Sequence, residues 1–392
     1  MKRILLVLFV CLGLVACTSN DSDKKDITLV KSKKEKLMPL EGVADYPAKI
    51  LYKQRVISSF DYSVRALDPV LTNGRAYFAD TKGHIRVLDL LTGKTVMKLK
   101  NKIRYSSDLG STDNYFLIGD SKANLTAYNL DTGAIGFTTK LNTELTTAPI
   151  YSKAHDLIYA RTIDGTMHAI RASDGKRVWV YERDNPALVL RGSGNPVLDV
   201  DLVISGYANG KIAALEAENG KAEWEVATTN ASGGTDLARM TDIVATPVVW
   251  RNSIYAALVN GNLVSIAKYS GRINWKKKIN VQDKLAVDSK LLYVVEEYSI
   301  VKALDNREGD FYWVQKDLAK RKLKGPVLMG DKVIVADELG FVYVLAKGKG
   351  KVLGKINTKL NKPIKNMFVK ENTLYLLAYN GYFMAIELSE DI

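Results

Sequence analysis

The sequence has 392 residues, a formal net charge of +13 and only two cysteines, Cys11 and Cys17. Because both cysteines lie in the first 17 residues, the rest of the chain cannot form a disulfide, a cysteine metal site or a cysteine nucleophile. The lysines are scattered and no basic-aromatic motif stands out, which favours a solvated basic surface and excludes nucleic acid as the expected partner.

Residues 1–17 have the features of an export signal that ends in a lipid attachment site. Lys2 and Arg3 precede an uncharged apolar stretch over residues 4–15, which is too short for a membrane-spanning helix. The run "LVAC" at residues 14–17 resembles a bacterial lipobox, so we expect a lipoprotein signal peptide over residues 1–16 and lipidation, including palmitate, at Cys17. Thr18, in place of the aspartate typical of lipoproteins kept at the inner membrane, favours the outer membrane. An ordinary signal peptide that contains a cysteine is the alternative.

Residues 17–44 predict a lipidated N-terminus and a flexible tether. The stretch is polar and rich in lysine, with few apolar residues to bury. The remaining residues, 45–392, contain no comparable linker and are long enough to bury a large core.

One pattern recurs along residues 45–392. The segments "GTMHAIRASDGKRVW" (165–179), "GKIAALEAENGKAEW" (210–224) and "GNLVSIAKYSGRINW" (261–275) share a glycine, an alternating strand, a turn that ends in glycine, and a tryptophan. Weaker copies bring the total to seven, and an eighth, partial copy ends the chain over residues 372–388. The turn glycines of the seven copies are Gly93, Gly133, Gly175, Gly220, Gly271, Gly309 and Gly350.

This repeat predicts an all-β fold, an eight-bladed β-propeller of four-stranded antiparallel blades. Each unit of about 40 residues has short strands separated by tight turns, which is typical of propeller blades. The last unit lacks one strand, and residues 46–57 read as a strand. We therefore expect pairing of the N- and C-terminal strands to close the ring, and we expect the repeated aromatic residues, such as Trp179 and Trp224, to pack between blades.

The sequence offers little for catalysis. The repeat resembles the tryptophan-bearing blade motif of pyrroloquinoline-quinone dehydrogenases, which need a cofactor cage and a bound cation with carboxylate ligands. The three histidines, His84, His155 and His168, are isolated, and His168 is expected to be a packed or surface residue of a strand. We therefore expect no enzymatic activity, no catalytic residue, no cofactor and no metal site.

Two segments between repeats are unusual. One contains "ALVLRGSGNP" (187–196), and the other is the longest insertion, "TTNASGGTDLARMTDIVATPVVW" (228–250). Long insertions between repeats lie on one face and often bind partners. These segments, the lipobox, the tether and the order of the tryptophan repeats resemble those of the BamB family, the lipid-anchored propellers of the outer-membrane β-barrel assembly (Bam) complex.

The resemblance implies a non-enzymatic scaffold that binds the periplasmic domains of BamA and assists insertion of outer-membrane proteins. Family members make this contact through residues that here are Leu188, Leu190 and Arg191, and through acidic residues of the second segment, the first of which matches Asp242. The second acidic position of the family is Val244 here, which puts part of the electrostatic contact in doubt.

Physical chemistry agrees with a docking role for these residues. Exposed leucines beside an arginine are typical of an interface hot spot. Asp242 could pair with Arg191 or with Arg239 and so keep the two loops in register. The alternative is that Leu188 and Leu190 pack inward within a blade strand.

Three other functions remain open at this stage. A periplasmic peptide-binding chaperone could add strands of unfolded outer-membrane proteins to its blade edges. A quinoprotein-type dehydrogenase and a structural lipoprotein that contacts the cell wall are weaker alternatives. The expected location is the periplasmic face of the outer membrane, where the N-terminal lipid would anchor the protein.

Overall fold

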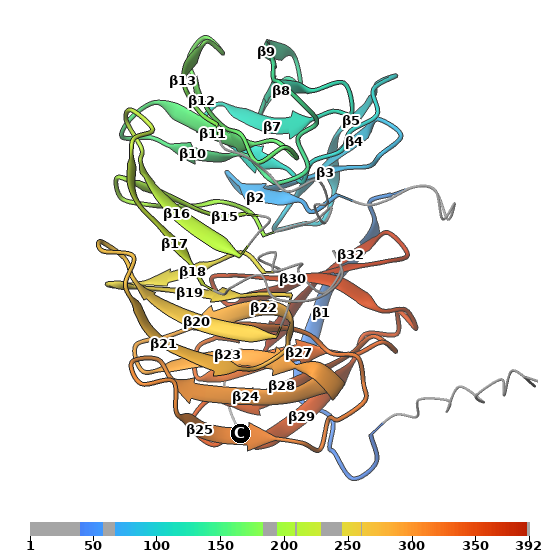
Figure 1. Ribbon diagram of the computed structural model, residues 1–392. Helices are drawn as coiled ribbons and strands as arrows, with labels where there is room; N and C mark the ends of the chain where they lie inside the picture. The colour runs from blue at the N-terminus through green and yellow to red at the C-terminus, as the bar shows by residue number, and fades with distance from the viewer. Residues whose placement is uncertain are drawn as a thin grey trace, which may run out of the picture. The chain divides into compact units, whose positions relative to one another are not determined.

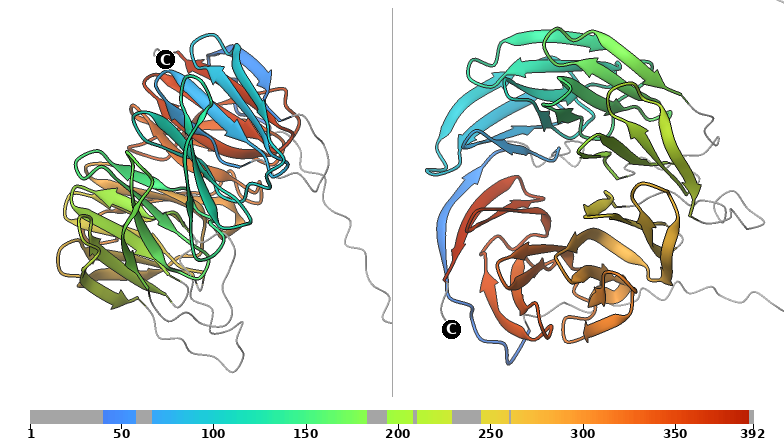
Figure 2. Two further views of the ribbon diagram at one scale, coloured as in Figure 1. Left: turned by 90° about the horizontal axis from the view of Figure 1, so that it is seen from above. Right: turned by 90° about the vertical axis from the view of Figure 1, so that its left-hand side faces the viewer.

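The computed structural model describes residues 40–57, 67–182, 194–207, 210–228, 245–259 and 261–389. Within these ranges the regular structure is β-strand, apart from one short 3₁₀ turn at Glu297–Ser299. The strands form eight four-stranded antiparallel sheets, the blades of a propeller, arranged in a ring (Figures 1 and 2). The predicted eight-bladed β-propeller is therefore confirmed.

Seven blades follow the chain order from inner to outer strand. Blade 1 comprises β2 (Val70–Thr72), β3 (Arg75–Ala79), β4 (His84–Asp89) and β5 (Thr95–Lys100), and blade 2 comprises β6 (Gly110–Ser111), β7 (Tyr115–Gly119), β8 (Asn124–Asn129) and β9 (Ile135–Lys140). Blade 3 comprises β10 (Ile150–Ser152), β11 (Leu157–Arg161), β12 (Met167–Arg171) and β13 (Arg177–Tyr181), and blade 4 comprises β14 (Val197–Asp199), β15 (Leu202–Gly206), β16 (Lys211–Glu216) and β17 (Ala222–Ala227). Blade 5 comprises β18 (Val248–Trp250), β19 (Ser253–Ala257), β20 (Asn262–Ala267) and β21 (Ile273–Lys278). Blade 6 comprises β22 (Val281–Val287), β23 (Leu291–Glu296), β24 (Ile300–Asp305) and β25 (Phe311–Gln315). Blade 7 comprises β26 (Lys324–Met329), β27 (Lys332–Ala336), β28 (Phe341–Ala346) and β29 (Val352–Asn357).

Blade 8 combines both ends of the described chain, as the sequence predicted. Its strands β30 (Ile364–Lys370), β31 (Thr373–Ala378) and β32 (Tyr382–Leu388) are completed by β1 (Ala48–Arg55), which pairs antiparallel with β32. The register runs from Ala48 opposite Leu388 to Arg55 opposite Tyr382. The strand expected over residues 46–57 therefore closes the ring (Figure 2).

The hydrophobic core is divided among the eight junctions between neighbouring blades. Each of eight buried clusters joins one blade to the next; for example, Tyr159 and Ala169 of blade 3 pack with Val203 and Leu215 of blade 4. A blade presents both faces to neighbours, so its middle strands are buried on both sides: β15 is buried at every residue. Continuous apolar strands of this kind are typical of sheets that are covered on both faces.

The repeated tryptophans lie between blades. The indole Nε1 of Trp224 in blade 4 donates to the carbonyl oxygen of Lys268 in blade 5 at 2.7 Å, and Trp179 does the same to Ala217 of blade 4 at 3.1 Å. Each ring also covers the turn glycine of the next blade, as Trp179 covers Gly220. The predicted packing role is confirmed.

An extended segment just before β1 runs along the outer edge of blade 7. The amide of Tyr46 donates to the carbonyl oxygen of Lys355 on β29 at 2.7 Å, and the amide of Lys355 donates to the carbonyl oxygen of Ala44 at 3.0 Å. Asp45 forms a parallel bridge with Lys355. An outer blade edge of this ring can therefore accept an extended strand.

Candidate functional site

The residues predicted to dock a partner lie outside the described residues. These are Leu188, Leu190 and Arg191 in the first loop and Arg239 and Asp242 in the second, together with Val244 and the expected lipidation site Cys17. Their roles remain predictions. The structure does describe the points where both loops return to the ring.

Both loops leave and rejoin the ring on the same face. The first joins outer strand β13 of blade 3 to inner strand β14 of blade 4, and the second joins β17 of blade 4 to β18 of blade 5. In an antiparallel four-stranded blade, every connection from an outer strand to the next inner strand emerges on the same side. We call this side of the ring the connection face.

The C-terminal ends of the two loops contact each other. The amide of Asn195 donates to Oγ1 of Thr246 at 3.1 Å, while Oδ1 of Asn195 accepts from the amide of Ala148 in blade 3 at 3.0 Å. A Cβ on Gly194 would lie 2.3 Å from the carbonyl oxygen of Ala245, so the two backbones touch at a position where only glycine fits. The structure thus brings the ends of the two loops together.

Arg161 binds the C-terminal end of the first loop. This side chain at the end of β11 is 3% exposed. Its guanidinium donates to the carbonyl oxygen of Gly194 at 2.8 Å, to Oγ of Ser205 at 3.2 Å, and to the carbonyl oxygen of Gly206. Sequence reasoning missed this residue, although an arginine directly after the apolar run "LIYA" was a usable signal.

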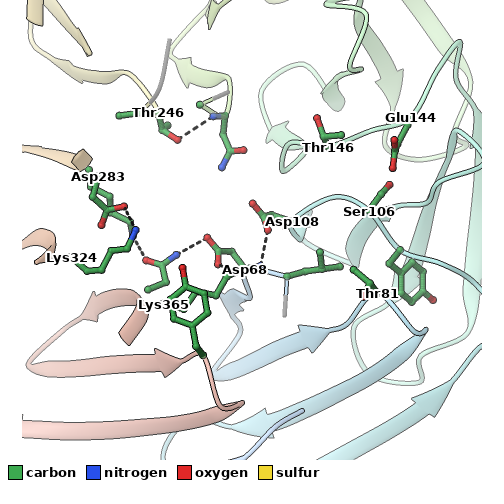
Figure 3. A pocket seen from close by; sticks show the side chains of 18 of the residues that line it. Asp68, Thr81, Ser106, Asp108, Glu144, Thr146, Thr246, Asp283, Lys324 and Lys365 are labelled. Atoms are coloured by element: carbon green, nitrogen blue, oxygen red, sulfur yellow. Dashed lines mark hydrogen bonds and ion pairs between the residues drawn. The ribbon is translucent and has the colours of Figure 1, made fainter. Parts of the chain in front are cut away.

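The joined loop ends open onto a cavity on the propeller axis. The cavity has a volume of about 540 Å³, and Gly194, Asn195, Ala245 and Thr246 are part of its wall. Figure 3 shows the charged side chains that also line it, among them Asp68, Asp108, Asp283, Lys324 and Lys365. The cavity is therefore polar, and the described ends of the two loops form part of its wall.

The charged groups of this cavity connect three blades near the propeller axis. Lys365 pairs with Asp68, whose other oxygen accepts from Nδ2 of Asn366 at 2.7 Å. The ammonium of Lys284 donates to Oδ1 of Asn366 and, at 3.1 Å, to the carbonyl oxygen of Met367. Burial lowers the pKa of Lys284 from its usual value. These contacts connect blades 1, 6 and 8, which is a structural role.

The histidines occupy structural positions. Nδ1 of His84 lies 2.9 Å from a carboxylate oxygen of Asp80, and Nε2 of His155 lies 3.1 Å from Asp201. His168 is fully buried in β12, and this burial lowers its pKa to about 4. Among the described residues, no three His, Cys, Asp or Glu side chains are grouped so as to hold a metal ion.

Within the described ranges, no helix has the length and apolar character needed to cross a bilayer.

Comparison with known proteins places these features in a family. A family model described as outer membrane protein assembly factor BamB matches residues 81–315. The BamB protein of Shewanella oneidensis is 26% identical over 396 residues, covering 96% of this chain and 95% of the relative. That of Alkalilimnicola ehrlichii is 35% identical over 207 residues, covering 53% and 54%.

Solved structures agree on the fold. The crystal structure of BamB from Moraxella catarrhalis superimposes with a TM-score of 0.76 at 23% identity, covering 87% of this chain and all of that chain. A quinohemoprotein alcohol dehydrogenase from Pseudomonas putida also shares the fold, with a TM-score of 0.66 at 12% identity, covering 88% of this chain and 77% of that one. The second match concerns architecture alone. The repeats, the eight closed blades and the family match together show that this chain belongs to the BamB family of outer membrane protein assembly factors.

Proposed function

We propose that this protein is a non-enzymatic scaffold lipoprotein of the outer-membrane β-barrel assembly complex. In this proposal it binds the periplasmic domains of BamA and assists insertion of outer-membrane proteins. The observation that supports the proposal is the hydrogen bond between Asn195 and Thr246, because the two segments that contain the predicted docking residues return to the ring at this one point.

The proposal assigns the contact to five side chains. Leu188 and Leu190 would be apolar anchors, and Arg191 would supply directional hydrogen bonds to the partner. Asp242 and Arg239 of the second loop would contribute charge. Arg161 would act as a positioning residue, because its bonds to Gly194, Ser205 and Gly206 connect the end of the first loop to blade 4.

The N-terminus would attach the protein to the membrane. A signal peptide over residues 1–16 would be removed, Cys17 would carry the lipid, and residues 17–44 would lead from the outer membrane to the propeller on the periplasmic side. Multiple acyl chains on one residue would anchor the protein stably, because a single chain gives only marginal binding.

Two observations support a scaffold rather than an enzyme. The relatives in Shewanella oneidensis and Alkalilimnicola ehrlichii are named as assembly factors. In addition, the axial cavity, where a quinoprotein-type enzyme would need a reactive centre, has its Asp68, Lys284 and Lys365 engaged in bonds between blades.

The docking site is tested by the double variant Leu190→Ala/Arg191→Ala. We expect it to fold normally but to capture less BamA from detergent extracts, because truncating interface anchors costs on the order of 1 to 4 kcal/mol of binding. The matched control is Leu91→Ala/Arg307→Ala, which removes an exposed leucine and an exposed arginine from turns on the opposite face. Undiminished capture by the first variant would contradict the assigned site.

A second function, binding of unfolded outer-membrane proteins, is favoured by the outer strand β25. It is the one outer strand of the eight blades that has no charged residue, and its Phe311, Tyr312 and Val314 are 54%, 49% and 41% exposed. Proteins usually protect such edges with charged side chains, above all lysine. An unfolded barrel strand, with alternating apolar residues, could pair with this edge as residues 44–46 pair with β29.

A further inference from the structure

One position of the repeat has no aromatic residue in blade 7. In blades 2 to 6 the fourth residue after the turn glycine is aromatic, and these residues are Phe137, Trp179, Trp224, Trp275 and Trp313. The corresponding residue of blade 7, four positions after Gly350, is Gly354 on β29. Strand β29 therefore contributes no ring at this position to its junction with blade 8, where the other blades place a large aromatic side chain.

Tyr46 supplies an aromatic ring at this junction from outside the repeat. Its side chain is 6% exposed and belongs to the buried cluster between blades 7 and 8, together with Ile356 of blade 7 and Ile386 of blade 8. A Cβ on Gly354 would lie 2.9 Å from Cβ of Tyr46 and 3.0 Å from its Cα. Tyr46 thus occupies the space that a side chain at position 354 would need.

The hydroxyl of Tyr46 also repeats the hydrogen bond of the tryptophans. Each of the four indoles donates to the carbonyl oxygen of the residue that directly follows the third strand of the next blade. Trp313 donates in this way to Lys347, after β28, at 2.7 Å, and Tyr46 donates to Ser389, after β32, at 3.4 Å. Tyr52 of β1 makes the same bond from blade 8 to the residue after β4, at 2.9 Å, so a tyrosine can replace the tryptophan.

The segment that ends in Tyr46 is attached to blade 7 at further points. The ammonium of Lys355 on β29 donates to the carbonyl oxygen of Leu40 at 2.7 Å, and the side chain of Leu40 packs against the buried cluster between blades 6 and 7. The backbone of Lys355 bonds to Ala44 and Tyr46 on the same side of the strand. We call residues 40–46 the strap, because they cover the outer edge of blade 7 from one junction to the next.

We propose that the strap attaches the N-terminal tether to the ring, and that Tyr46 holds it there in place of the missing aromatic residue of blade 7. In a ring of eight blades, blade 7 lies opposite blade 3, from which the first docking loop departs. Membrane attachment and partner docking would then use opposite sides of the ring. This separation rests on the proposed function, whereas the strap itself does not.

The test moves the aromatic residue from the strap back into the repeat. The variants are Tyr46→Ala, the conservative Tyr46→Phe, and the double variant Tyr46→Ala/Gly354→Trp. Tyr379→Ala, which removes a tyrosine of blade 8 that is 60% exposed, is the control. All proteins are full chains with Cys17→Ser, so that acylation cannot contribute. Hydrogen exchange followed by mass spectrometry reports on residues 40–46, and urea denaturation gives the unfolding midpoint.

We expect the amides of residues 40–46 to exchange at least about tenfold faster in Tyr46→Ala than in the unsubstituted chain. Burial of one aromatic side chain is worth more than a tenfold change in an equilibrium constant, so its loss should release the strap. Tyr46→Phe keeps the ring and should keep the protection, as should Tyr379→Ala. Unchanged protection of residues 40–46 in Tyr46→Ala would overturn the role of Tyr46.

The double variant decides whether Tyr46 stands in for the repeat residue. An indole at position 354 should restore the unfolding midpoint that Tyr46→Ala loses, while residues 40–46 stay unprotected because the indole takes their space. A double variant that is no more stable than Tyr46→Ala, or that does not fold, would show that the two residues do not share one position. Both measurements are made without BamA, so their failure is distinct from a failure of the docking proposal.

Discussion

At the scale of single residues, the turn glycines of the blades meet two demands at once. Gly220 has a φ of +76°, which favours glycine, and a Cβ at this position would lie 2.5 Å from the indole ring of Trp179 in the preceding blade. Gly74 has a similar φ of +69° but no atom within 4 Å of its Cβ position. A comparison of Gly220 with Gly74 therefore separates the cost of the left-handed backbone from the cost of packing against a neighbouring side chain.

We therefore expect Gly220→Ala to be much more destabilising than Gly74→Ala. The left-handed backbone costs an alanine about 1 to 2 kcal/mol at either position, and overpacking against Trp179 adds about 1 to 3 kcal/mol at Gly220 only. Urea denaturation followed by tryptophan fluorescence measures both. Equal shifts of the two unfolding midpoints would show that the indole moves aside without cost.

The buried His168 predicts an acid-sensitive step in stability. Burial lowers its folded-state pKa to about 4, against about 6.5 in an unfolded chain. Above pH 6.5 the residue is neutral in both states, and its contribution to the free energy of unfolding is complete. This contribution is lost as the pH falls towards 4, because the unfolded chain then binds the proton more readily than the folded protein does.

The variant His168→Leu should remove that step. Relative to the variant, the unsubstituted protein should lose up to about 3 kcal/mol of unfolding free energy between pH 6.5 and pH 4. Thermal unfolding of both proteins across this range is the measurement. A stability difference that stays constant with pH would mean that His168 titrates normally in the folded ring.

At the scale of elements, the outer strands differ in how they protect their edges. The outer strand β21 carries Lys276, Lys277 and Lys278, whereas β25 has exposed aromatic residues and no charge. Lys290 and Lys302 lie 4.7 Å from the ring centres of Tyr312 and Phe311, so cations cover the rings but leave the strand itself uncharged.

Lysines placed on β25 should abolish capture of unfolded barrel strands at this edge. The variant Tyr312→Lys/Val314→Lys adds two charges there, and Val96→Lys/Ile135→Lys adds two at exposed positions of β5 and β9 as a control. Photo-crosslinking to a fluorescent peptide with the alternating pattern of an outer-membrane strand reports binding. Equal crosslinking in both variants would exclude β25 as the binding edge.

At the scale of the whole molecule, closure depends on a single strand near the C-terminus. β32 lies between β31 and β1 in blade 8. Its Phe383 and Ala385 also belong to the cluster shared with Ala76 and Phe78 of blade 1. Without β32, both the pairing of the two chain ends and one junction of the ring would be lost.

Removal of residues 382–392 should therefore prevent formation of a stable ring. A domain has a net stability of only about 5 to 15 kcal/mol, which the exposure of a whole buried strand exceeds. Removal of residues 390–392 alone is the control and should leave the unfolding midpoint unchanged. Circular dichroism and limited proteolysis distinguish the two, and a truncated chain as resistant to protease as the control would disprove the role of β32.

The sequence by itself determined the blades, their number and the way they close. Strand alternation, turn glycines such as Gly175, and tryptophans such as Trp224 act within about 15 residues of chain, so their pattern is legible without coordinates. The partner-binding assignment at Leu188, Leu190 and Arg191 depended instead on family resemblance, because an exposed leucine and a packed one look alike in a strand-like run.

Only the tertiary structure decided what meets across the ring. Lys365 pairs with Asp68, 297 residues away, and Arg161 reaches the end of the first loop at Gly194. The physical reason is that blade formation is local, whereas the side chains that a closed ring brings together depend on the rotation of each blade against the next, which no short sequence pattern encodes.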